Sequence, residues 1–229
     1  MKFSKDTMVV LENFSRINPN LLLTKGNNIS TLSIEETLLG HAEIKETIPS
    51  DFGIYDLTEF LSAMSLFKDP EIEFYKGYVT ISENDQVIKY FGAEPEILTK
   101  PNINDDNVPT IKDNFPEASI NFSLSLDNIN MIIKTSNVLK AQDVLVRGDG
   151  SSIKVIVGDK KNSSANKFEF PVGSTKEIFS AYFKISNLRL VPGDYNVSIS
   201  SNKVSKFVNA AEVTKLTYYV GLESDSDFE

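Results

Sequence analysis

The chain has 229 residues, 41% of them hydrophobic, and its 15 Phe and 8 Tyr can fill substantial cores. This length suits one large domain or two domains of about 110 residues each. Cysteine is absent, which excludes disulfides and thiolate metal sites, and no apolar run approaches the ~20 residues of a membrane-spanning helix. The net charge of −9 argues against a surface that is basic throughout, but it leaves room for one basic face.

The first fifty residues predict a capped amphipathic helix followed by strands. Ser4 is a suitable N-cap, and apolar residues recur at helical spacing until Pro19 forces an end. Lys5, Glu12 and Arg16 fall off that apolar stripe. Strands are expected at Leu21–Thr24, Ile29–Ile34 and His41–Ile48, with a turn at residues 25–28.

A second helix has the clearest local signature in the chain. Asp56 and Glu59 form an Asp-x-x-Glu pair that resembles a capping box, and an apolar face follows from Leu57 to Phe67. The helix is expected to stop before Pro70. A β-meander then follows, with strands at Ile72–Tyr75, Tyr78–Ile81 and Val87–Phe91.

Between Gly92 and Glu117 the amino-acid composition of the sequence changes. This stretch holds four prolines and a polar cluster at residues 102–107, which is typical of a long connector between domains. We therefore expect an N-terminal domain at residues 1–108, a C-terminal domain at residues 109–229, and the connector at about residues 92–117.

The second half repeats the design of the first. A strand at Ile120–Leu124 precedes a helix that Ser125 can cap, and Lys134 lies away from the apolar stripe of this helix. Further strands are expected at Asp143–Arg147, Ile153–Val157, Lys167–Pro171, Glu177–Phe183, Tyr195–Ser200, Lys206–Asn209 and Leu216–Leu222, with a hairpin at residues 148–150. A short fourth helix is expected at Ile185–Val191, and an acidic, mobile tail at Glu223–Glu229. Two matched halves favour a scaffold built by repetition.

The sequence shows no set of catalytic residues. The lone His41 lies in a predicted strand, where a structural or surface role is the common one. Asp225 and Asp227 belong to a flexible acidic end rather than a metal site, and no phosphate-binding loop or dinucleotide fingerprint occurs. We therefore expect a non-enzymatic protein with no catalytic residue, no bound metal and no cofactor.

Several short motifs, taken in their order and spacing, resemble the sliding clamp of T-even bacteriophages. They are Met1–Thr7, Asn13-Phe14, Ile54–Leu57, Phe60-Leu61, Met64–Leu66, Pro192–Tyr195 and Tyr219–Asp225. The motifs lie in both halves and at both ends, so the resemblance spans nearly the whole chain. The segments Gly92–Glu117 and Lys160–Lys176 diverge from it.

The resemblance implies an α+β DNA-clamp fold, in which two similar domains each pack helices on an antiparallel sheet and three identical subunits assemble into a closed ring. Such a homotrimer encircles duplex DNA without sequence specificity and tethers the replicative DNA polymerase, which raises processivity by effective concentration. An ATP-dependent clamp loader would open the ring. No membrane partner is implied, and the expected location is the cytoplasm of the infected bacterial host.

Two other classes of protein stay open at this point. One is a non-enzymatic phage structural or assembly protein built of two β-rich domains, whose composition would look much the same. The other is a single-strand nucleic-acid-binding module, which needs exposed aromatic residues beside basic ones. Tyr75, Tyr78 and Tyr90 near Lys76 and Lys89 come closest to that pattern.

A sliding ring should meet phosphates through a few basic side chains on its inner helices. The predicted DNA-facing residues are Lys5, Arg16, Lys68, Lys134, Lys140, Lys184 and Arg189. Glu12 opposes this role, and ordinary solvated charges are the alternative interpretation. A partner-peptide pocket is predicted at Ile97, Leu98, Ile103 and Val108, which could equally be buried anchors of the connector.

Overall fold

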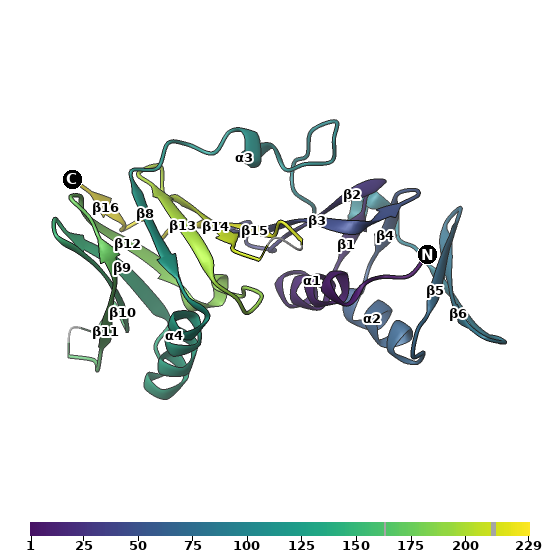
Figure 1. Ribbon diagram of the computed structural model, residues 1–229, viewed down its shortest axis with the longest axis horizontal. Helices are drawn as coiled ribbons and strands as arrows, with labels where there is room; N and C mark the ends of the chain where they lie inside the picture. The colour runs from purple at the N-terminus through teal and green to yellow at the C-terminus, as the bar shows by residue number, and fades with distance from the viewer. Residues whose placement is uncertain (163, 212–213) are drawn as a thin grey trace. The chain divides into compact units, whose positions relative to one another are not determined.

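The computed structural model describes residues 1–162, 164–211 and 214–229, and the chain divides into two compact units (Figure 1). The first unit comprises Met1–Asn114 with Glu212–Leu216, and the second comprises Phe115–Ala211 with Thr217–Glu229. Within the described residues, no helix is long and apolar enough to cross a membrane.

The first unit packs two helices on antiparallel strands (Figure 1). In chain order its elements are α1 (Lys5–Ile17), β1 (Leu21–Leu23), β2 (Gly26–Leu32), β3 (Leu38–Ile48), β4 (Phe52–Ile54), α2 (Leu57–Ser65), β5 (Glu71–Tyr75), β6 (Tyr78–Glu83) and β7 (Gln86–Phe91). The strands are ordered β4-β1-β2-β3 in one sheet and β5-β6-β7 in another. The connector adds a 3₁₀ turn, η1 (Pro95–Ile97), and a short helix, α3 (Thr110–Asp113).

Helix α1 begins and packs as its sequence predicts. The Thr7 backbone N–H donates to the Ser4 side chain, which caps the helix, and the apolar stripe Val10, Leu11, Phe14 and Ile17 is buried. The Glu46 carboxylate on β3 accepts a hydrogen bond of 2.6 Å from the Thr7 hydroxyl, so the start of α1 is also fixed to the sheet. The result is a helix whose opposite face stays in solvent.

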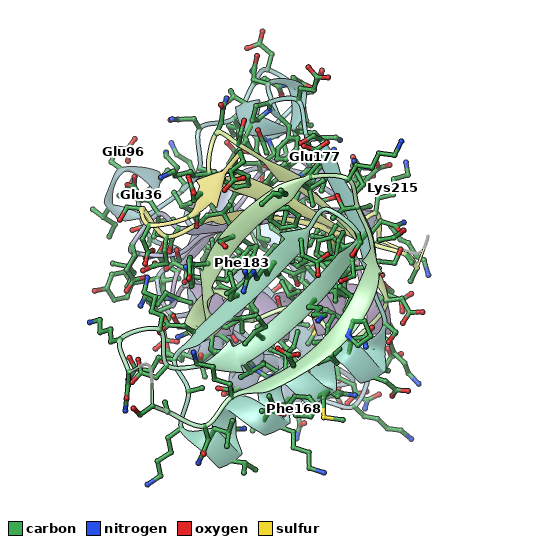
Figure 2. The ribbon with its side chains drawn as sticks, turned by 90° about the vertical axis from the view of Figure 1, so that its left-hand side faces the viewer. Glu36, Glu96, Phe168, Glu177, Phe183 and Lys215 are labelled. Carbon is green, nitrogen blue, oxygen red and sulfur yellow. The ribbon has the colours of Figure 1, made fainter. Side chains whose placement is uncertain are left out.

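The second unit has one long helix and two antiparallel sheets. Its elements are β8 (Ile120–Leu124), α4 (Leu126–Leu139), β9 (Asp143–Asp149), β10 (Ser152–Gly158), β11 (Phe168–Ser174), β12 (Ile178–Lys184), the 3₁₀ turn η2 (Ile185–Asn187), β13 (Tyr195–Ser200), β14 (Val204–Asn209), β15 (Thr217–Gly221) and β16 (Asp227–Phe228). The strand orders are β11-β10-β9-β12-β16 and β15-β14-β13-β8. Phe183 lies within this unit, whereas Phe168 lies at the border of its sheet (Figure 2).

The two units repeat one topology. The order β4-β1-β2-β3 after α1 matches β12-β9-β10-β11 after α4, and the meander β5-β6-β7 matches β13-β14-β15. Even the strand that precedes the helix has a counterpart. Met1 exchanges backbone hydrogen bonds of 2.7 and 2.8 Å with Ile72 on β5, as β8 pairs with β13. The predicted repetition of helix on antiparallel sheet is confirmed.

Two predicted elements of the second half are wrong. The expected helix Ile185–Val191 is only the three-residue turn η2, because Leu188 leaves the helical region (φ −98, ψ 40) and the Val191 N–H donates to the Tyr218 hydroxyl at 3.1 Å. The expected mobile tail is a strand: β16 pairs with β12 at Phe228 and Asp227. The tail is held because its backbone continues the sheet.

Smaller differences concern the ends of elements. Helix α2 ends at Ser65, before the expected apolar face reaches Phe67, β3 begins at Leu38 instead of His41, and the three-residue β4 had no sequence signal. Strand β2 already begins at Gly26, in the expected turn. Gly26 has a φ of 113°, and the pairing register shifts between it and Asn28, so a glycine bulge carries the strand through this point.

Candidate DNA interface and partner pocket

Helix α1 presents four exposed residues in one line: Lys5, Val9, Glu12 and Arg16. They are spaced four, three and four residues apart, which places them within an arc of about 60° on a helix with 3.6 residues per turn. The buried stripe of α1 faces the sheet, so this line faces away from it. The two predicted DNA-facing residues of α1 therefore share one face, and Glu12 lies between them.

Helix α4 presents a line with the same spacing: Asp127, Met131, Lys134 and Val138. A reciprocal capping box between Ser125 and Asn128 fixes the start of this helix. On the exposed line of α4, Lys134 lies between Met131 and Val138.

Lys140 ends α4 as its C-cap residue, in the left-handed conformation with a φ of 52°, and it is also exposed. A positive charge at a helix C-terminus complements the helix dipole, so Lys140 has a local structural use as well. Lys134 and Lys140 both lie toward the C-terminal end of the helix.

Two further predicted residues lie outside the helices. Lys68 follows α2 and is exposed, with its backbone N–H 3.1 Å from a Glu83 carboxylate oxygen. Arg189 lies between η2 and β13 and is exposed. The failure of the fourth helix to form therefore leaves Arg189 on a loop.

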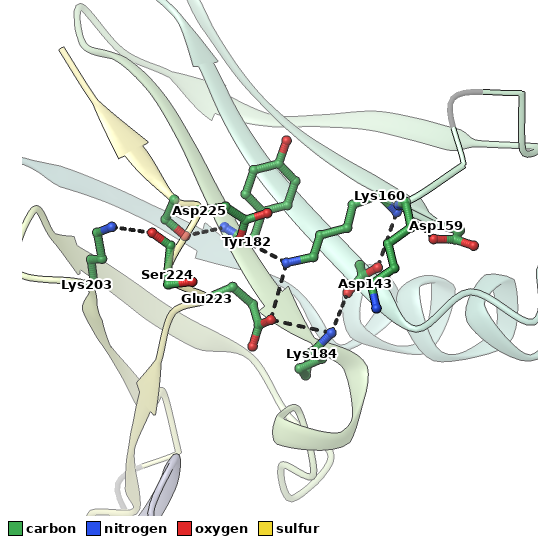
Figure 3. A network of polar contacts seen from close by, with 11 residues as sticks. Asp143, Asp159, Lys160, Tyr182, Lys184, Lys203, Glu223, Ser224 and Asp225 are labelled. Carbon is green, nitrogen blue, oxygen red and sulfur yellow. Dashed lines mark hydrogen bonds and ion pairs between the residues drawn. The ribbon is translucent and has the colours of Figure 1, made fainter.

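Lys184 belongs to an ion-pair network at the end of β12 (Figure 3). Its Nζ lies 3.1 Å from Asp143 Oδ1 and 3.4 Å from Glu223 Oε2. The Asp143 hydrogen bond, opposed by partial burial, raises the pKa of Lys184 above its ordinary value. Its positive charge is therefore already compensated within the second unit.

Lys160 completes this network and was missed by the sequence analysis. Its Nζ lies 2.8 Å from Asp225 Oδ1 and 3.2 Å from Glu223 Oε2, and 5.3 Å from the centre of the Tyr182 ring. The hydrogen bond from Lys160 holds the pKa of the Asp225 carboxyl below its usual value. Two lysines face three carboxylates, so this network anchors the C-terminal segment and adds no positive charge to the surface.

The predicted pocket residues separate in the structure. Ile97 is 62% exposed, whereas Leu98 is buried, and Val108 is half-buried with its N–H donating to Asn104. Ile103 forms a backbone bridge with Pro109 and lines a shallow pocket with an empty volume of about 280 Å³. The other lining residues are Leu22, Thr24, Ser30, Lys100, Pro101 and Asn107.

Side-chain amides tie the connector to the hairpin beside this pocket. The Asn28 Nδ2 donates to the Asp106 carbonyl at 3.1 Å, and the Asn107 Nδ2 donates to the Lys25 carbonyl at 2.8 Å. Both bonds join the connector to the β1–β2 hairpin within the first unit. Ile103 thus lies at this pocket, and Ile97, Leu98 and Val108 are not among its lining residues.

A second, entirely apolar cavity lies in the other unit. It is lined by Phe122, Leu124, Ile129, Ile132, Ile133, Val144, Val146, Val155, Phe183, Leu188, Leu190 and Phe207. Since α4 and both sheets supply these apolar residues, the space belongs to the core of the second unit.

His41 has a structural environment. It is 2% exposed, its Nδ1 lies 3.0 Å from the Ser30 hydroxyl oxygen, and burial lowers its pKa to about 4. Among the described residues, no group of three His, Cys, Asp or Glu side chains could hold a metal ion. Within the part of the chain that the structure describes, His41 is therefore a buried structural residue.

Comparison with solved structures defines the class of fold. The chain matches Archaeoglobus fulgidus PCNA bound to the C-terminal region of FEN-1 with a TM-score of 0.72 and 11% identity, over 99% of this chain and 98% of that one. It matches a chain of the PCNA2–PCNA3 complex of Sulfolobus tokodaii with a TM-score of 0.67 and 9% identity, over 96% of both chains. The fold is the α+β DNA-clamp fold, as predicted.

Sequence comparison identifies the family. A model for DNA polymerase processivity factors matches residues 4–98. The sliding clamp of Vibrio phage KVP40 is 30% identical over 98% of this chain and all of that protein, and the sliding clamp of Escherichia phage RB69 is 28% identical over 99% and 98% of the two chains. The chain therefore belongs to the sliding clamps of bacteriophages.

As a sliding clamp, the protein confers processivity on DNA polymerase and is not an enzyme. Members of this family bind DNA and the polymerase. The comparisons decide in favour of the clamp over the structural or assembly protein and over the single-strand-binding module.

Proposed function

We propose that three copies of this chain close into a ring around duplex DNA, with the two compact units as its two clamp domains. The observation that carries the proposal is a pair of sheet edges. Among the described residues, β7 is one of the two outermost strands of its sheet, with β5 at the other edge, and β11 is one of the two in its own sheet, with β16 at the other edge. A head-to-tail contact in which β7 of one copy pairs with β11 of the next would cover both edges. Repeated contacts of this kind close into a ring of three copies when each contact rotates one copy by a third of a turn relative to the next.

The side chains at these edges suit such a contact. On β7, Val87 is 63% exposed and Phe91 is 69% exposed. On β11, Phe168 is 37% exposed and lies beside Phe170, with ring centres 5.8 Å apart. Burying large apolar side chains stabilises an interface by about 25 cal/mol per Å² of apolar surface before the costs of association.

The charges along the two strands are also complementary. Lys89 on β7 and Glu169 on β11 have opposite sign, and Glu169, which is exposed, has a long contact of 3.9 Å with Lys154 on β10. Pairing the two edges would bring these charges to the same interface, which favours contact between unlike edges over contact between like ones.

The proposed DNA contacts come from the exposed faces of α1 and α4. Lys5, Arg16, Lys134 and Lys140 form the main set, and Lys68 and Arg189 lie on loops that could extend it. Lys184 is excluded because Asp143 and Glu223 already compensate its charge. Isolated lysines meet phosphates as point charges and read no bases, so binding would lack sequence specificity.

The polymerase would bind through a short peptide, for which the pocket beside Ile103 is the proposed site. Its lining combines the apolar Leu22 and Pro101 with the charged Lys100. A separate ATP-dependent clamp loader would open the ring, and the protein would act in the cytoplasm of the infected host.

Two measurements test the ring. Light scattering over a concentration series should show a species of three times the 25.5 kDa of one chain. Phe91→Glu should reduce this species to monomers, because a carboxylate would be buried at the proposed edge. The matched control is Ile34→Glu, since Ile34 is 66% exposed on the β2–β3 turn. Equal trimer mass in both variants would exclude the β7 edge.

A further inference from the structure

The exposed lines of α1 and α4 hold few positive charges for a surface that faces DNA. The α1 line carries Lys5 and Arg16 but also Glu12. On α4, Lys134 is accompanied by Asp127. The formal charge of the four-residue line is thus +1 on α1 and zero on α4. A helix face built for tight phosphate binding would accumulate lysine and arginine at these positions.

The remaining positions on these lines are apolar although they are exposed. Val9 on α1 is 45% exposed, and Met131 and Val138 on α4 are 43% and 72% exposed. An aliphatic or thioether side chain has no strong donor for a phosphate oxygen. On α4 the apolar pair flanks Lys134 at spacings of three and four residues, so no second cation lies beside it on that line.

Glu12 has a second effect through its spacing. It precedes Arg16 by four residues, the separation at which side chains on a helix are neighbours, and the acidic residue on the N-terminal side is the more favourable order. At this spacing the Glu12 carboxylate would repel phosphates near α1 and would also compete with them for the Arg16 guanidinium. Both effects would weaken DNA binding at the centre of the α1 line.

We propose that Glu12, together with the apolar pair Met131 and Val138, keeps the number of phosphate contacts small and so sets how freely the clamp moves along DNA. This inference rests on the proposed DNA-facing role of α1 and α4. A closed ring stays on DNA because it encircles the duplex, and it can slide because its contacts with phosphates are weak. Each added phosphate contact would therefore slow its movement along DNA. Glu12 thus makes no contact with DNA itself but weakens the contacts that Lys5 and Arg16 make with phosphates.

The test compares binding to a short blunt-ended duplex over a series of salt concentrations. Glu12→Gln removes one repulsive charge with little change in shape or helix propensity, and should tighten binding at low salt by about two- to threefold. Val138→Lys adds a cation and should steepen the fall of log K with log salt by about 0.9 for each contact made. Single-molecule tracking of the loaded clamp should show slower sliding for both variants.

Matched controls lie on the β2–β3 turn of the first unit. Glu35→Gln makes the same charge change as Glu12→Gln at an exposed residue, and Ile34→Lys makes the same kind of change as Val138→Lys. Both controls should bind and slide like the original protein. A change in helix stability alone would alter the melting curve and leave the salt dependence as it was.

A third variant separates failure of this inference from failure of the proposed interface. If Lys134→Glu weakens DNA binding while Glu12→Gln and Val138→Lys behave like their controls, the inference is overturned and the interface stands. If Lys134→Glu also behaves like the original protein, the proposed interface is overturned and the inference falls with it.

Discussion

Acidification should destabilise the folded protein through His41, the only histidine in the chain. The side chain is 2% exposed, and burial followed by the charge of Lys112 lowers its pKa from 6.5 to about 4, against smaller opposing effects of Glu43 and the Ile29 backbone. The lowered pKa means that the unfolded chain binds the proton more readily. Stability should therefore fall as the pH drops below 6.5, and the loss should be complete below about 4.

The magnitude follows from the two pKa values. The whole difference corresponds to about 3 kcal/mol, since one pKa unit is about 1.4 kcal/mol. At pH 5 the unfolded chain is almost fully protonated at this residue and the folded chain is mostly neutral. The loss between pH 7 and pH 5 should therefore be about 2 kcal/mol in the free energy of unfolding.

Urea unfolding at pH 7 and pH 5 measures this loss. The protein with His41→Gln should lose about 2 kcal/mol less than the original protein over the same interval, because carboxylates titrate alike in both. A proton NMR titration gives the histidine pKa directly, since there is only one histidine to observe. A folded-state pKa near 6.5, or equal losses of stability in the two proteins, would refute the argument.

Three further changes have definite expected outcomes. Gly40→Ala places a Cβ 2.7 Å from the Phe14 ring under α1 and should lower the free energy of unfolding by about 1–3 kcal/mol in urea titrations. Lys160→Met removes the ion pairs that hold the C-terminal segment and should speed hydrogen exchange at the β16 amides. Lys134→Glu with Lys140→Glu should reduce clamp loading on DNA, most strongly at low salt, while light scattering still shows the trimer.

Each of these changes has a control or a contrary result. Gly173→Ala is the control for Gly40→Ala, because its Cβ would meet the nearest atom at an ordinary 3.5 Å; equal losses would show that the Phe14 contact does not matter. Unchanged exchange at β16 would mean that backbone pairing with β12 alone holds the tail. Unchanged loading in the charge-reversal variant would exclude the exposed face of α4.

Local signals predicted the two helices of the proposed DNA interface. Ser4 and Ser125 cap α1 and α4, and the apolar stripes behind them have helical spacing, so the amino-acid sequence alone indicates which residues form the exposed lines. The predicted helix at Ile185–Val191 failed because apolar spacing over seven residues does not distinguish a helix from a short turn. The hydrogen bond from the Val191 N–H to the Tyr218 hydroxyl joins residues far apart in the sequence, so no local pattern could indicate it.

The rest of the site depended on contacts that sequence patterns do not carry. Lys184 looked like a free cation until folding placed Asp143 and Glu223 beside it. The pocket beside Ile103 brings the connector next to Leu22 on β1, about eighty residues earlier in the sequence. No local sequence motif predicts that these two segments are in contact. The resemblance to phage clamps was enough to predict the function. Which residues lie beside Lys184 and Ile103 could be learned only from the three-dimensional structure.

The most direct test of the central claim is retention of the loaded clamp on circular DNA before and after the DNA is cut. A ring that encircles duplex DNA and holds it weakly should stay on the closed circle and leave the linear form within seconds to minutes by sliding off its ends. Equal retention on both forms would mean that direct contacts hold the protein to DNA, and it would contradict the account of a closed, sliding ring.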